Sequence, residues 1–326
     1  MDFFISGYGD GTSSTLKLYH NDQVIWKDSI PNPSFLCQTD TLLFAAGEFD
    51  SHSSITSYRK TNMGYRKISI LHIEGKQLCH LSLHKKQRLI VGSCWGSGTF
   101  FTVFYRSDGT FGNHSVYKVL PDKKGEISRF HASAFCKNWL FTANMGMDQI
   151  ICFDIESGIC REYSRLNFPR HSGPRHLLLH SHRDILYCIT EDSSQLFAVD
   201  IQNPGSMKIL FYTDLTSPRF SGKCYGSSIA ATKSFSDLYA ANRGENTIVH
   251  FHLDYNGIPE FSHRFSCHGN WPRHLTLLEC DSYLAVANQK SNEAVFLRRS
   301  PDSGMLSNTP IKKDCHPDIS FICEQL

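Results

Sequence analysis

Short apolar runs that end in small residues, each followed by a polar turn, recur along the whole chain. Seven such runs start at residues 3, 42, 89, 140, 186, 238 and 284, and the later starts lie 46 to 52 residues apart. That distance holds about four short strands with their turns, and few stretches show helical periodicity. A four-stranded unit repeated seven times is typical of a β-propeller.

A second apolar strand precedes six of the seven runs, so that the two form a predicted β-hairpin. These preceding strands start near Ser34, His80, His131, Arg175, Ser227 and Arg273, each 14 or 16 residues before the end of the run that follows. The first run has no preceding strand, and the apolar segment 318–326 has no strand after it. We therefore expect 318–326 to pair with the strand containing residues 3–7 and to close the ring. The sequence predicts an all-β, seven-bladed β-propeller that forms a single domain over residues 1–326.

Two polar segments interrupt the rhythm, at residues 49–68 and 112–130. The second carries Lys118, Lys123, Lys124 and Arg129. We interpret both as solvated loops, with rims of a central funnel as the alternative.

Composition narrows the classes of function. The 33 basic and 31 acidic side chains leave a formal charge of +2, which argues against nucleic acid as a partner. The twelve cysteines are scattered and form no C-x-x-C pair, which favours free thiols in a reducing cytoplasm. Neither a signal peptide nor a membrane span is evident, so we expect a cytoplasmic protein that does not bind membranes. The oligomeric state is left open.

Hairpin geometry indicates which side chains meet at the channel. The start of one antiparallel strand lies beside the end of its partner, and all these positions share one face of a propeller. Arg175 and Glu191 are 16 positions apart in one hairpin and should therefore be neighbours. The pair is either a strand clamp or part of an active site. The same mouth should also receive His80, His131, Arg243, Arg273, Glu48, Gln289 and Asp318.

The segments G-P-R-H…E (173–191), A-A-N-R-G-E-N-T-I (240–248) and A-N-Q-K-S (287–291) resemble the lactonase family of seven-bladed propellers. This family includes the propeller-type 6-phosphogluconolactonases and the carboxymuconate-lactonising enzymes. The resemblance covers essentially the whole chain. The chain departs from the family pattern at the turn between the two inner strands of a blade, where the family often has P-D-G and this chain has other sequences. It implies His131, Arg175, Glu191 and Arg243 as catalytic residues.

Opening a lactone requires an activated water and stabilisation of the acyl oxygen as it gains charge. Glu191 or His131 is the candidate base, while Arg175 and Arg243 would bind anionic groups or the oxyanion. Arg273, His80 and Gln289 are candidate substrate-binding residues. His176 and His274 follow Arg175 and Arg273 and should point to the opposite strand face.

The resemblance implies a cytosolic hydrolase of a small anionic sugar lactone, with 6-phosphogluconolactone of the pentose phosphate pathway as the favoured substrate. No ligand spacing for a metal and no phosphate-binding loop occurs, so we expect neither a metal nor a cofactor. Two alternatives stay open. One is a muconate-type lactonising cycloisomerase. The other is a non-catalytic propeller that binds a protein partner through an apolar patch including Trp95, Phe100 and Phe101.

Overall fold

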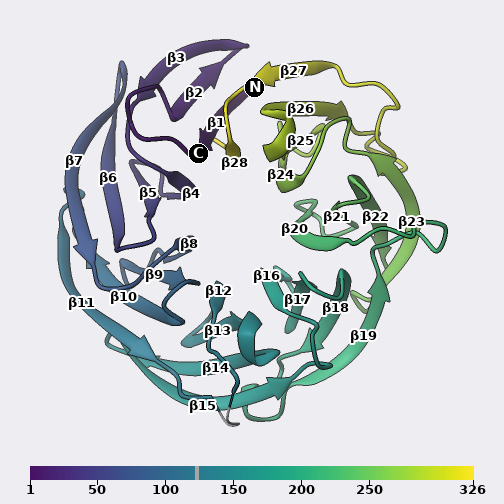
Figure 1. The fold of residues 1–326 in the computed structure, drawn as a ribbon, viewed down its shortest axis with the longest axis horizontal. Coiled ribbons are helices and arrows are strands. Elements are labelled where there is room, and N and C mark those ends of the chain that lie inside the picture. Colours follow the sequence, from purple (N-terminus) through teal and green to yellow (C-terminus); the bar gives the residue numbers. More distant parts are fainter. Residues whose placement is uncertain (122–124) are drawn as a thin grey trace.

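The computed structural model describes residues 1–121 and 125–326. In this part of the chain, four-stranded antiparallel sheets are arranged as seven blades around a central axis (Figure 1). Lys123 and Lys124 lie outside the described residues. The predicted all-β, seven-bladed architecture is confirmed.

The blades follow one another in chain order, and within each blade the strands run from the axis outwards. Blade 1 contains β28 (Ile319–Glu324), β1 (Asp2–Gly7), β2 (Leu16–His20) and β3 (Gln23–Asp28). Blade 2 contains β4 (Pro33–Gln38), β5 (Leu42–Glu48), β6 (Ser53–Thr61) and β7 (Gly64–Ile73), and blade 3 contains β8 (Leu78–His84), β9 (Leu89–Cys94), β10 (Thr99–Tyr105) and β11 (Phe111–Lys118). Blade 4 contains β12 (Phe130–Cys136), β13 (Trp139–Asn144), β14 (Gln149–Glu156) and β15 (Ile159–Asn167). Blade 5 contains β16 (Pro174–Leu179), β17 (Ile185–Thr190), β18 (Gln195–Asp200) and β19 (Lys208–Asp214); blade 6 contains β20 (Tyr225–Ala231), β21 (Asp237–Arg243), β22 (Thr247–Leu253) and β23 (Pro259–Ser266); blade 7 contains β24 (Pro272–Leu278), β25 (Tyr283–Asn288), β26 (Glu293–Arg298) and β27 (Lys312–Cys315). Three single-turn 3-10 helices, η1 (Met145–Met147), η2 (Pro204–Ser206) and η3 (Gln289–Ser291), complete the described elements.

The two ends of the chain close the ring, as predicted. β28 is the innermost strand of blade 1 and pairs antiparallel with β1, from Phe3 opposite Glu324 to Gly7 opposite Ile319. Figure 1 shows the last strand of the chain lying beside the first. This pairing removes the open edge that β1 would otherwise present.

The recurrent apolar runs are the second strands of the blades, and both of their faces are buried. In β1, Phe3 and Ile5 pack against blade 7, whereas Phe4 on the opposite face packs against blade 2. Successive side chains of a strand point to opposite faces, so a strand between two neighbouring blades must be apolar at every position. Each fully buried large side chain of this kind contributes about 1.5–3 kcal/mol.

Both polar segments contain strands. The prediction of a loop is wrong for most of residues 49–68, whereas in residues 112–130 it is wrong for 112–118 and holds for the other described residues before β12. Residues 49–68 contain β6 and the first half of β7, and residues 112–130 contain most of β11. Outer strands such as β7 have one face in solvent, and their exposed polar residues conceal the alternation expected of a strand. The predicted apolar patch is also wrong in part, because Phe100 and Phe101 are completely buried.

Candidate active site

A local irregularity in the innermost strands builds the central channel. The pairing of the first and second strands of each described blade shifts near the channel, so that a residue of the first strand is left out of the ladder. An extra residue of this kind is a β-bulge, which redirects its side chain. The bulged residues that line the channel are Ser34, Cys79, His131, Arg175, Ser227, Arg273 and Ser320.

Several bulged residues connect one blade to the next. Ser34 Oγ donates to the carbonyl of Leu78 at 3.0 Å, and Ser227 Oγ donates to that of Pro272 at 2.6 Å. Arg175 Nε donates to the carbonyl of Ser227 at 3.1 Å. The position of Arg175 is therefore held by the neighbouring blade as well as by its own.

Five of the predicted site residues line one pocket at the mouth of the channel. His131, Arg175, Glu191, Arg243 and Arg273 surround a cavity of about 210 Å³, together with Glu48, Gln77, Cys79 and Trp95. Three guanidinium groups and two carboxylates meet there, which leaves an excess of positive charge. This excess favours an anionic ligand.

Glu191 joins two of the arginines. Arg175 Nη1 donates to Glu191 Oε2, and Arg243 Nη2 approaches the same oxygen at 3.1 Å. Burial raises the pKa of Glu191, but the charges and hydrogen bonds of Arg175 and Arg243 outweigh burial and lower the pKa to about 2. Glu191 is therefore ionised near neutral pH, and most of its basicity is lost to the two ion pairs.

Arg243 is held by further contacts. Its Nε donates to the carbonyl of Tyr225 at 3.3 Å and its Nη2 to that of Gly226 at 3.0 Å. Its guanidinium lies 5.3 Å from the ring centre of Trp271. Burial and the charge of Arg175 lower the pKa of Arg243 to about 9, so the side chain stays cationic at pH 7.

A second group of hydrogen bonds positions Arg273. Its Nη2 donates to the hydroxyl of Tyr8 at 2.5 Å, and that hydroxyl donates to Glu48 Oε2 at 2.8 Å. Burial raises the pKa of Tyr8 far above its usual value, so the phenol keeps its proton. Glu48 thus acts on Arg273 through Tyr8 and also directly, since Arg273 Nη2 lies 3.9 Å from Glu48 Oε2.

His131 presents an uncharged imidazole to the pocket. Burial, together with the nearby charges of Arg175 and Arg273, lowers the pKa of His131 well below its usual 6.5. Its Nδ1 is buried and has no hydrogen-bond partner among the described residues. A neutral imidazole with an unused lone pair or proton is suited to proton transfer.

His80 lies beside the arginine pocket rather than among the residues that line it. The bulge in β8 gives Cys79 the channel position equivalent to those of His131 and Arg175, and His80 then follows as His176 follows Arg175. His80, His176 and His274 line a narrow cavity of about 30 Å³ deeper in the channel. Burial lowers the pKa of His176 to about 4, so this imidazole is uncharged at neutral pH.

Gln289 and Asp318 lie outside the set of residues that lines the pocket in the described part of the chain. Gln289 Nε2 donates to Asp318 Oδ1 at 3.5 Å in an exposed contact. Glu48 does line the pocket, as the hairpin geometry predicted.

Sequence reasoning did not identify Cys79, Gln77 and Trp95 as pocket residues. Cys79 was missed because a bulge has no clear signal in one sequence. Burial raises the pKa of the Cys79 thiol far above its usual range, which makes it a poor nucleophile.

The described part of the chain has no helix long and apolar enough to cross a bilayer.

The sequence and the fold of this chain are similar to those of known proteins. The chain is 24% identical over 293 residues to a 6-phosphogluconolactonase of Bacillus subtilis (strain 168), covering 86% of this chain and 83% of the relative. It is 27% identical over 309 residues to a 6-phosphogluconolactonase of Formosa agariphila, covering 87% and 86% of the two chains. The structure of a periplasmic gluconolactonase of Pseudomonas aeruginosa superposes with a TM-score of 0.91 at 21% identity, over 99% of this chain and 98% of the other. The family described as "Lactonase, 7-bladed beta-propeller" matches residues 6–316, and the chain therefore belongs to this lactonase family.

Proposed function

We propose that this protein hydrolyses a small anionic sugar lactone, with 6-phosphogluconolactone as the favoured substrate. The observation that carries the proposal is the buried group of three arginines beside a neutral histidine, in a pocket of positive net charge. The names of the two relatives support the same substrate. They favour neither the cycloisomerase nor the partner-binding alternative.

Arg175 and Arg243 are suited to stabilise the oxyanion. Attack of water on the acyl carbon places a negative charge on the former carbonyl oxygen. The described hydrogen bonds of Arg243 use its Nε and Nη2 atoms, so that both hydrogens of Nη1 are available to a ligand. Donors held rigidly before the reaction stabilise such a charge strongly, and the loss of one typically costs about 10²–10³ in kcat.

His131 is favoured over Glu191 as the general base. Both groups have a pKa below neutrality, but for different reasons. In this proposal the ion pairs that lower the pKa of Glu191 are retained in the substrate complex, because they hold the two arginines in place. The pKa of His131 is lowered by burial and by repulsion from arginines, and an anionic substrate neutralises part of that repulsion.

The proposed reaction then runs as follows. His131 takes a proton from water while the new C–O bond forms, and the tetrahedral intermediate collapses with cleavage of the ring C–O bond. The proton returns from His131 to the departing ring oxygen, which becomes a hydroxyl group. Glu191 acts as a positioning residue that holds Arg175 and Arg243.

The direct test is hydrolysis of 6-phosphogluconolactone, measured against the spontaneous opening of the same lactone in buffer. We expect acceleration by the wild-type protein and a higher KM for the unphosphorylated gluconolactone. Arg243→Ala should lower kcat by about 10²–10³ if this guanidinium stabilises the oxyanion, whereas it should raise KM chiefly if the guanidinium holds the phosphate. A rate equal to that of buffer for both lactones would exclude the proposal.

A further inference from the structure

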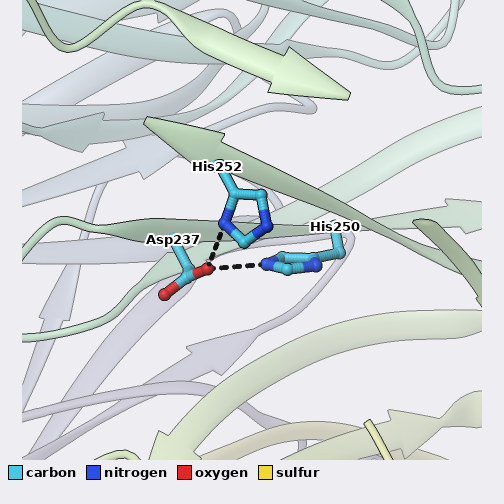
Figure 2. Close-up of side chains that lie close together, drawn as sticks. All are labelled: Asp237, His250 and His252. Carbon is cyan, nitrogen blue, oxygen red and sulfur yellow. Dashed lines mark hydrogen bonds and ion pairs between the residues drawn. The ribbon is translucent and has the colours of Figure 1, made fainter. Parts of the chain in front are cut away.

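A compact group of possible metal ligands lies at the opposite end of β21 from the arginine pocket. Asp237 begins β21 and Arg243 ends it, so the two positions are roughly 20 Å apart at 3.3 Å per residue. His250 and His252 come from the neighbouring strand β22. Figure 2 shows both imidazole rings directed at the same oxygen of the Asp237 carboxylate.

The sheet fixes this arrangement. Asp237 is paired directly with His252, and His250 lies two residues away on the same face of β22. Asp237 Oδ1 lies 2.7 Å from His250 Nε2 and 2.9 Å from His252 Nδ1. The three possible ligand atoms all lie within 4.8 Å of one another.

The other carboxylate oxygen is already occupied. Asp237 Oδ2 accepts hydrogen bonds from Ser236 Oγ at 2.7 Å and from Arg299 Nη2 at 2.6 Å. Arg299 Nε also donates to the hydroxyl of Tyr239 at 2.8 Å. Outer contacts of this kind orient the ligands of metal sites in proteins, and here they leave Oδ1 directed at the two imidazoles.

We propose that Asp237, His250 and His252 form a binding site for a zinc-like transition-metal ion. Two imidazoles and one carboxylate suit Zn²⁺, whereas Ca²⁺ and Mg²⁺ require more oxygen ligands. His250 is fully buried but the side chain of His252 is 49% exposed, which gives an ion a path to the site from solvent.

The imidazoles can change from hydrogen-bond donors to ligands without losing a proton. His250 Nε2 donates to Asp237 Oδ1, and its Nδ1 is buried without a partner among the described residues. When the proton moves to Nδ1, Nε2 presents a lone pair to the ion. The same change in His252 frees Nδ1 and places a proton on Nε2, which lies 3.4 Å from Ser262 Oγ.

The ion would bind within blade 6, beside contacts that already join this blade to blade 7, and it would not take part in lactone hydrolysis. β21 and β22 belong to blade 6, whereas Arg299 follows the third strand of blade 7. Tyr239 adds a second link, since its hydroxyl donates to the carbonyl of Gly304 at 2.5 Å. Metal binding should therefore raise the melting temperature and leave kcat unchanged.

The test is equilibrium dialysis of the chelator-treated full chain against Zn²⁺, with parallel titration by Co²⁺, whose tetrahedral complexes absorb strongly in the visible range. We expect one equivalent to bind in the wild type and in His114→Ala, which removes an exposed histidine from β11. His252→Ala should weaken binding at least about tenfold and abolish the rise in melting temperature with Zn²⁺. His252→Gln, which keeps a polar group beside Asp237, should behave in the same way.

The site has no metal function if the wild-type chain shows no saturable Zn²⁺ binding and no cobalt absorption band. The proposal is equally overturned if both His252 variants bind like the wild type. In either case the three residues form only the hydrogen-bonded network seen in Figure 2. The cobalt spectrum needs no substitution, so the test remains decisive even if a variant folds poorly.

Discussion

Replacing Glu191 by Gln tests how strongly the buried charges hold the channel mouth together. The substitution keeps the size of the side chain and removes the negative charge shared by Arg175 and Arg243. Both guanidiniums are then left close together in a buried site without their common partner. We expect a loss of stability, because removing one member of a buried ion pair leaves uncompensated charge.

The magnitude follows from the pKa of Glu191. Its fall from 4.5 to about 2 corresponds to about 3 kcal/mol of unfolding free energy, at 1.36 kcal/mol per pH unit. Losing one partner of a buried pair typically costs about 3–5 kcal/mol, which agrees. With an unfolding entropy of about 2.1 cal/mol/K per residue over 326 residues, the melting temperature should fall by about 4 °C.

The effect should depend on pH in a defined direction. The folded-state pKa of Glu191 lies below the unfolded-state value, so its stabilisation is fully present above pH 4.5 and is lost as the pH falls through about 2. The neutral Gln resembles the protonated Glu. The difference in urea midpoint between wild type and Glu191→Gln should therefore shrink as the pH is lowered through this range.

Asp192→Asn is the matched control, because it removes one carboxylate charge at the next position. Burial and the charge of Glu191 raise the pKa of Asp192, so this change should cost little stability. Urea and thermal unfolding of both variants at pH 7, with kcat measured well below the melting temperature, complete the assay. An unchanged melting temperature and urea midpoint in Glu191→Gln would refute the reasoning. Full kcat in a destabilised Glu191→Gln would show that the pair is only a strand clamp.

Two further predictions concern the base and the closure of the ring. His131→Ala should lower kcat by about 10²–10⁴ while the melting temperature changes little, and His114→Ala is the control. A wild-type kcat in His131→Ala would show that His131 is not the base. Deleting residues 318–326 removes β28 and exposes the edge of β1, so we expect aggregation in size-exclusion chromatography, whereas removal of residues 325–326 alone should be tolerated. A normal melting curve after the longer deletion would contradict the closure.

Much of the fold was determined by local sequence pattern. The apolar runs mark strands buried on both faces, such as β1, and their number predicted the blades. The unpaired segments at the two ends predicted that 318–326 closes the ring. The spacing within one hairpin placed Arg175 beside Glu191, since antiparallel register depends on residues close together in the chain.

Only the tertiary structure decided which side chains converge. A bulge in β8 brings Cys79 to the channel mouth and places His80 deeper in the same channel, whereas regular alternation would direct two successive side chains to opposite faces. Arg243 reaches Glu191 from the next blade, and Arg299 reaches Asp237 in the same way. Contacts between blades depend on how whole sheets pack around the axis. The pattern along any one strand specifies which face is buried, but the packing of the blades determines what that face meets.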